Sequence, residues 1–162
     1  MDLSGDGIKQ ATKLFCQAAW VFEHMQTLVT QMPAGEATLD FSKESLTMST
    51  NLCLAQAQYL FFRMARENKM KPLMLSKICA QISIYFQKAY ESNQVNSGLR
   101  AFENGGFANV LGYHAKYYYA MAYQYMAEAQ VKLVEEKAKG QGRAVTLCKI
   151  TVAKFEEAKP YA

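Results

Sequence analysis

The chain has 162 residues, of which 51% are hydrophobic and 20% charged, with only three prolines. This composition excludes long disordered segments and suits one compact domain with a sizeable core. The net charge of +4 is small and the basic residues are interspersed with 14 acidic ones, so we expect no nucleic-acid partner. The first residues lack a signal-peptide pattern, and no window approaches the roughly 18 uncharged apolar residues of a membrane span, so any membrane contact should be peripheral.

Apolar residues recur at spacings of three and four along most of the chain, whereas strict alternation of apolar and polar residues is absent. This periodicity predicts an all-α fold of about five helices. The first helix follows the polar stretch 4–7 and ends before Pro33 and Gly35. The second helix is expected at about 42–68, and the third at about 72–92 with a proline in its first turn.

The segment 93–109 is rich in Gly, Asn and Ser and is the longest connection that we expect. A fourth helix follows to Lys139, and Gly140 and Gly142 bracket a short turn into the fifth. Long helices joined by short turns pack as antiparallel hairpins, which stack into a solenoid. The consensus of a tetratricopeptide repeat does not recur, so we expect an array that is TPR-like in shape only. The fifth helix should bury one stripe: Ala144, Cys148, Thr151, Phe155 and Ala158.

The sequence contains no recognisable catalytic or metal-binding motif. Its four cysteines lie far apart, without a CxxC pair or a neighbouring histidine. We interpret them as reduced, buried small hydrophobes, which is typical of a cytoplasmic protein: Cys16, Cys53, Cys79 and Cys148. A phosphate-binding P-loop, an HExxH pair and a GxSxG elbow are also missing. We therefore expect no enzyme, no metal, no cofactor and no small-molecule substrate.

The third predicted helix has more apolar residues than one core stripe requires. The stripe itself is complete: Leu75, Cys79, Ile82, Phe86 and Ala89. Met74 and Ile78 lie one turn apart on a flanking face, and Phe61 on the second helix lies on a similarly mixed face. These three residues either contact neighbouring helices, since helices inside an array bury two faces, or form a docking patch for another protein.

Basic residues surround these three positions in the sequence: Arg63, Arg66, Lys69, Lys71 and Lys77. Glu67 is the one acidic residue among them. Such a cluster is either an ordinary solvated face or a surface that attracts an acidic amphipathic helix. The many tyrosines of 113–125 are interpreted as packing between helices, although a nucleic-acid module would also use tyrosines and lysines.

The segment 52–71 contains the element LAQAQ, then two adjacent phenylalanines and the run KMK. It resembles the BRO domain of Alix-like adaptor proteins. The stretch 6–25 resembles the preceding helix of that family, and AKYYYAMAYQYMAEAQ and GQGRAVTLCK resemble its following helices more loosely. The resemblance implies that residues 1–162 are a partial BRO domain, a central helical array within a larger curved domain.

The resemblance also implies a partner and a site. BRO domains of this type bind the C-terminal amphipathic helix of a Snf7-type ESCRT-III subunit in endosomal sorting and membrane scission. The family's groove positions correspond to Phe61, Met74 and Ile78, with Lys9 at a basic position on its border and Asp6 near the acidic residues beside it. The expected mode is helix-in-groove recognition by a cytoplasmic protein recruited to endosomes. The alternative is a structural helical scaffold without independent binding.

Overall fold

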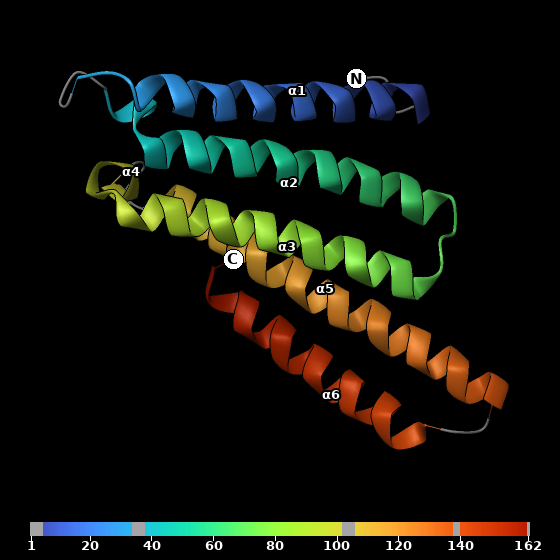
Figure 1. The fold of residues 1–162 in the computed structure, drawn as a ribbon. Coiled ribbons are helices and arrows are strands. Elements are labelled where there is room, and N and C mark those ends of the chain that lie inside the picture. Colours follow the sequence, from blue (N-terminus) through green and yellow to red (C-terminus); the bar gives the residue numbers. More distant parts are fainter. Residues whose placement is uncertain (1–4, 34–37, 102–105, 138–139, 162) are drawn as a thin grey trace.

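In the computed structural model the described residues are 5–33, 38–101, 106–137 and 140–161, and they contain helices and no strand. The predicted all-α fold is confirmed. Each long helix packs against the next long helix in the chain, and Figure 1 shows the resulting staircase of antiparallel neighbours. The long helices are α1 (Gly5–Val29), α2 (Lys43–Glu67), α3 (Pro72–Val95), α5 (Gly106–Lys137) and α6 (Gln141–Ala158). The short elements are η1 (Leu39–Phe41), α4 (Ser97–Ala101) and η3 (Lys159–Tyr161).

The turn between α2 and α3 is tight and follows a known helix-ending motif. The Lys69 N–H donates to the Arg66 carbonyl at 3.0 Å, and the Met70 N–H donates to the Ala65 carbonyl at 3.0 Å. These two bonds form a Schellman motif, in which the residue after the cap is usually glycine. Here that residue is Lys69, with a φ of 52°. The motif fixes how α3 leaves α2, and Pro72 then begins α3.

Because a side chain in the left-handed region is strained by about 1–2 kcal/mol, Lys69→Gly is expected to stabilise the fold. Loss of a lysine near a helix C-terminus and the greater freedom of glycine in the unfolded chain reduce the net gain to about 0.5–1 kcal/mol. Urea unfolding followed by circular dichroism measures this gain. The matched variant Lys71→Gly, at a φ of −57°, should lose stability instead. Equal effects of the two variants would contradict the assignment of strain to Lys69.

Two boundaries next to the predicted loop differ from the prediction. Helix α3 continues to Val95, and the predicted loop 93–109 contains α4 and the beginning of α5 at Gly106. Asn93 explains part of the first difference, because its buried side-chain amide donates to the Leu99 carbonyl at 3.2 Å and so ties α4 to the end of α3. The described part of the fourth predicted helix ends at Lys137, and residues 138–139 lie outside the description.

The core lies between α2, α3 and α5. Two small residues of α3 allow α5 to come close: the Ser76 hydroxyl donates to the Ala122 carbonyl and the Ser83 hydroxyl to the Ala115 carbonyl, both at 2.8 Å. The Tyr118 ring stacks on Phe86 with centroids 6.0 Å apart, so packing between helices is confirmed for this tyrosine. None of the described helices is long and apolar enough to cross a membrane.

The prediction that all four cysteines are buried is wrong for two of them. Cys79 is buried and Cys53 partly so, whereas Cys16 and Cys148 are exposed. In the stripe predicted for α6, Ala144 and Ala158 are buried and Thr151 and Phe155 partly buried, as expected. The exception is that Leu147, three residues after Ala144, is buried in place of Cys148, four residues after it. Both spacings have the helical period, so the sequence alone did not distinguish them.

Burial raises the pKa of the Cys79 thiol to about 12. We therefore expect iodoacetamide at pH 8 to modify Cys16 and Cys148 in the folded chain and to leave Cys79 protonated and unmodified. Peptide mapping by mass spectrometry identifies the labelled sites, and urea should make every site reactive. The raised pKa also destabilises the fold between pH 9 and about pH 12, because there the unfolded chain loses a proton that the folded chain keeps. Labelling of Cys79 as fast as Cys16 would contradict its burial.

Candidate protein-binding surface

Two large apolar side chains are exposed on neighbouring helices at one end of the array. Phe61, near the end of α2, is 39% exposed, and Met74, in the first turn of α3, is 47% exposed. In Figure 1 the end of α2, the start of α3 and the start of α1 all lie at this end of the molecule. The helices thus bring the predicted site residues to one region, although not all of them reach its surface.

The prediction that Ile78 is surplus to the packing of α3 is wrong. Ile78 is only 6% exposed and belongs to the same core cluster as Leu75, Cys79 and Ile82. Its flank of α3 is covered by the array itself, as expected for a helix that buries two faces. Ile78 can therefore contribute to the floor of a surface that Met74 borders, but it offers little area for direct contact.

Asp6 and Lys9 lie in the first turns of α1 and form an ion pair with each other. The Lys9 Nζ lies 3.0 Å from Asp6 Oδ1, and both side chains are largely exposed. An acidic residue at this place also interacts favourably with the N-terminal end of the helix dipole. Because the pair is solvated, it contributes little to folding, and both groups remain accessible to another molecule.

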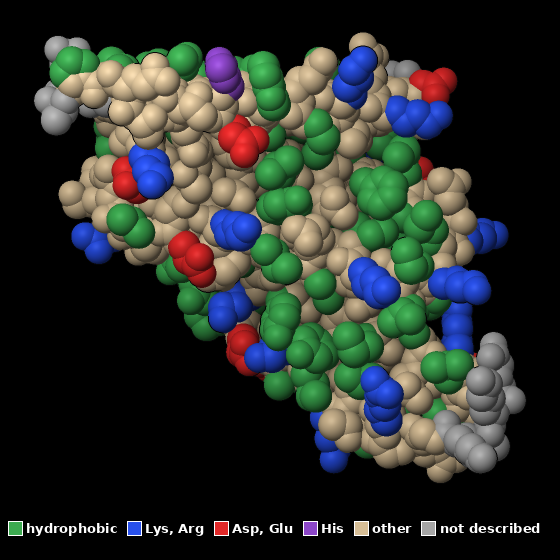
Figure 2. Space-filling model, in the orientation of Figure 1, with side chains coloured by type: hydrophobic (Ala, Val, Ile, Leu, Met, Phe, Trp, Pro, Cys, Tyr) green, Lys and Arg blue, Asp and Glu red, His purple; other side chains and the backbone are tan. Residues whose placement is uncertain are grey.

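The cations predicted around the site cluster at the turn between α2 and α3. Lys69, Lys71 and Lys77 are exposed, and the Arg66 guanidinium lies 5.9 Å from the centroid of the Phe62 ring. Within the described part of the chain none of these groups forms an ion pair. Figure 2 shows Lys and Arg side chains among hydrophobic ones around this end, with few acidic side chains. The surface is therefore apolar with a positive border.

Sequence reasoning missed two exposed apolar side chains beside Met74. Met70 and Leu73 flank it in the turn, and together with Leu133 of α5 they line a depression of about 400 Å³. Lys69, Lys71 and Lys132 also border this depression. The signal in the sequence was two apolar residues, Met70 inside the KMK run and Leu73 just after it, whereas the expected docking patch began only at Met74.

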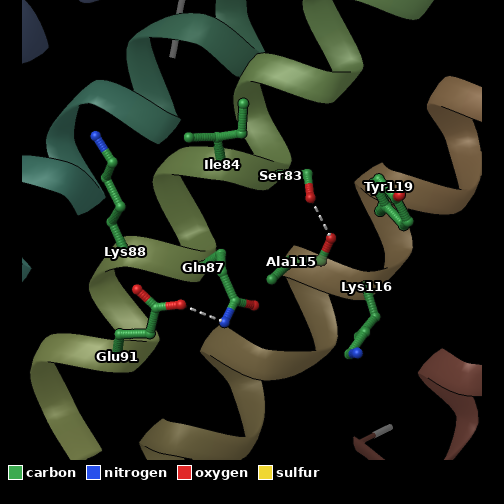
Figure 3. Close-up of a pocket in the computed structure, with 8 residues that line it drawn as sticks. All are labelled: Ser83, Ile84, Gln87, Lys88, Glu91, Ala115, Lys116 and Tyr119. Carbon is green, nitrogen blue, oxygen red and sulfur yellow. Dashed lines mark hydrogen bonds between the residues drawn. The ribbon is translucent and has the colours of Figure 1, made fainter.

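A second depression, of about 430 Å³, lies between α3 and α5 on a surface that also carries basic and apolar side chains. Figure 3 shows the Ser83 hydroxyl pointing to the Ala115 carbonyl where the two helices meet. In the same view the Gln87 amide donates to Glu91 Oε1 at 2.9 Å. The residues that line the depression are Ser83, Ile84, Gln87, Lys88, Glu91, Ala115, Lys116 and Tyr119.

The fold defines a helical-array scaffold whose accessible features are apolar and basic surfaces. Among the residues that the structure describes, no group of His, Cys, Asp and Glu is arranged to hold a metal ion. The family model of the BRO1-like domain matches residues 2–162, so the chain belongs to the BRO1-like domain family. The family predicted from the segment 52–71 is confirmed.

Individual proteins are also similar to this chain in sequence or in fold. The chain is 28% identical over 155 residues to mouse "Programmed cell death 6-interacting protein", which covers 94% of this chain and 17% of the mouse protein. It is 33% identical over 95 residues to "ALG-2 interacting protein X" of Dictyostelium discoideum, covering 57% of this chain and 12% of that protein. The solved "ALIX BRO1 CHMP4C complex" has the same fold, with a TM-score of 0.56 and 21% identity, over 95% of this chain and 48% of that one. The chain thus spans less than a fifth of the curated relatives just named.

Proposed function

We propose that this chain is part of an Alix-type BRO domain that binds the C-terminal amphipathic helix of a Snf7-type ESCRT-III subunit. The helix lays its apolar face over Phe61 and Met74, with Ile78 beneath them. Lys9 and Asp6 border the bound helix and exchange their mutual ion pair for contacts with it. In this proposal the protein is cytoplasmic and is recruited to endosomes through its partner, where it acts in endosomal sorting and membrane scission.

The observation that carries the proposal is the exposure of Phe61 and Met74 on adjacent helices near the cluster of cations at the turn between α2 and α3. Exposed apolar area of this kind is stabilised when a partner covers it. The cations of the turn have no acidic partner among the described residues, so a helix with carboxylates beside its apolar face is complementary to them. Recognition of an amphipathic helix in a groove meets both requirements at once.

The relatives support the same class of partner. In the solved "ALIX BRO1 CHMP4C complex", a BRO1 domain of the same fold is bound to CHMP4C. That similarity covers 95% of this chain, including α2 and α3.

Fluorescence anisotropy with a labelled peptide of the CHMP4C C-terminal helix tests the proposal. We expect saturable binding to this chain, with an affinity that falls modestly as salt rises because the border is basic. A labelled single-stranded oligonucleotide serves as the comparison, since a nucleic-acid module would bind it with a steep dependence on salt. Absence of peptide binding to a chain that circular dichroism shows to be folded would contradict the proposal.

A further inference from the structure

The exposed stripe of α3 does not end at Met74. It continues at spacings of three and four through Lys77, Gln81, Ile84 and Lys88. Ile84 is 46% exposed, about as much as Met74, although it lies in the middle of a long helix between two neighbours. A large apolar side chain at such a position is a second candidate anchor on the exposed side of α3.

Ile84 is turned toward a different neighbour from Met74. Ten residues separate them, which corresponds to about 15 Å along the axis of α3 and about 80° around it. Ile84 accordingly borders the depression between α3 and α5, which Tyr119 also lines, and Figure 3 shows the contact between Ser83 and Ala115 lying between these two residues. A path from Phe61 on α2 over Met74 to Ile84 on α3 and Tyr119 on α5 therefore crosses α3 obliquely.

The α5 side of this second anchor is held in place. The exposed Tyr119 ring has the Lys154 Nζ of α6 5.5 Å from its centroid, and its hydroxyl lies 3.3 Å from the Tyr123 hydroxyl. The ring packs edge to face against Tyr123, with centroids 5.2 Å apart. Because both ends of the side chain have partners, Tyr119 is held in place where it lines the same depression as Ile84.

The charges along this path are mostly positive and unpaired. Lys77 and Lys88 on α3 and Lys116 on α5 form no ion pair within the described residues. Glu91 accepts from the neutral Gln87 amide and keeps its negative charge in the depression, whereas Glu157 pairs with Lys154 and also attracts Lys116, so the path carries more positive than negative charge. An occupant of this path therefore gains from carboxylates on both of its edges.

We propose that the helix bound at Phe61 and Met74 extends across α3 to a second anchor formed by Ile84 and Tyr119. This inference rests on the proposed function and specifies its partner: an acidic amphipathic helix of at least about three turns. Its apolar side chains are spread over a stretch of about ten residues, and its carboxylates face Lys77, Lys88 and Lys116. A partner helix must be long enough to reach both anchors, so the two anchors together favour long helices over short ones. A single apolar patch would not make this distinction.

Anisotropy titrations with three versions of the CHMP4C helix test this inference: the complete helix and two peptides that each lack two turns at one end. Ile84→Asp is expected to weaken binding of the complete helix about tenfold or more. One shortened peptide should bind the parent chain more weakly by a similar factor and should be insensitive to Ile84→Asp. That same peptide should still lose binding to Met74→Asp, because it retains the first anchor.

Val152→Asp is the matched control, since Val152 is an exposed apolar residue of α6 that borders neither anchor. It should bind every peptide as the parent does. If Ile84→Asp binds the complete helix like the parent while Met74→Asp does not, the helix ends before Ile84 and this inference is wrong. If neither variant changes the affinity, the proposed function itself fails. The two failures are thus distinguishable.

Discussion

Ile78→Asp is expected to unfold the array. Ile78 is buried in the core cluster between α2, α3 and α5, where an ionised carboxylate would have no partner. Burying an unpaired charge, together with the lost apolar contacts, costs several kcal/mol, which is comparable to the whole stability of a small domain. Circular dichroism during urea unfolding should show either no cooperative transition or a midpoint far below that of the parent chain.

Two further variants serve as controls for this prediction. Ile78→Val removes one methylene and should cost only about 0.5–1.5 kcal/mol. Met74→Asp, four residues earlier on the exposed part of the same helix, should change stability by no more than about 0.5 kcal/mol. A folded Ile78→Asp chain with the stability of the parent would show that solvent reaches this position. Because Ile78→Asp is expected to unfold the chain, we expect a loss of binding in this variant to result from unfolding and not from a lost contact with the partner.

The helices and their order were predictable because apolar spacing in α1, α2, α3 and α5 is set by one requirement, the burial of a continuous stripe. Pro72 and Gly140 also marked helix boundaries correctly, whereas Gly142, which was expected to bracket the turn, lies inside α6. The family followed from the segment 52–71, whose combination of small polar residues, paired phenylalanines and a basic run is more specific than any periodicity. The Schellman turn was not predictable, because it places a lysine where glycine is the usual residue.

The difference in exposure between Met74 and Ile78 could not be predicted from the sequence. Both flank the core stripe of α3, and local spacing gives them the same status. Their exposure depends on how closely the neighbouring helices approach at each level: near the turn Met74 remains open, and one turn further along the array closes over Ile78. Ile84, which lies outside the predicted core stripe, is also exposed although it lies in the middle of α3.

Phe61→Asp and Met74→Asp are each expected to abolish detectable binding of the ESCRT-III helix. Truncation of a central anchor typically costs about 2 kcal/mol or more, and an introduced carboxylate adds repulsion toward an acidic partner. A loss of about 2 kcal/mol alone corresponds to roughly a 30-fold weaker Kd. Because both side chains are exposed in the free chain, these substitutions should leave the fold intact, which circular dichroism can verify.

The alanine variants Phe61→Ala and Met74→Ala remove the apolar contact without introducing a charge. They therefore separate the loss of contact from the repulsion between the introduced carboxylate and an acidic partner. If one partner side chain covers both residues, the double alanine variant should lose less binding energy than the two single losses added together. Val95→Asp, which places the same charge on a 76% exposed apolar residue at the far end of α3, should bind like the parent. Binding by folded Phe61→Asp and Met74→Asp chains at the affinity of Val95→Asp would place the partner elsewhere on the array. Additive losses from the alanine variants would instead indicate that the partner helix contacts Phe61 and Met74 through separate side chains.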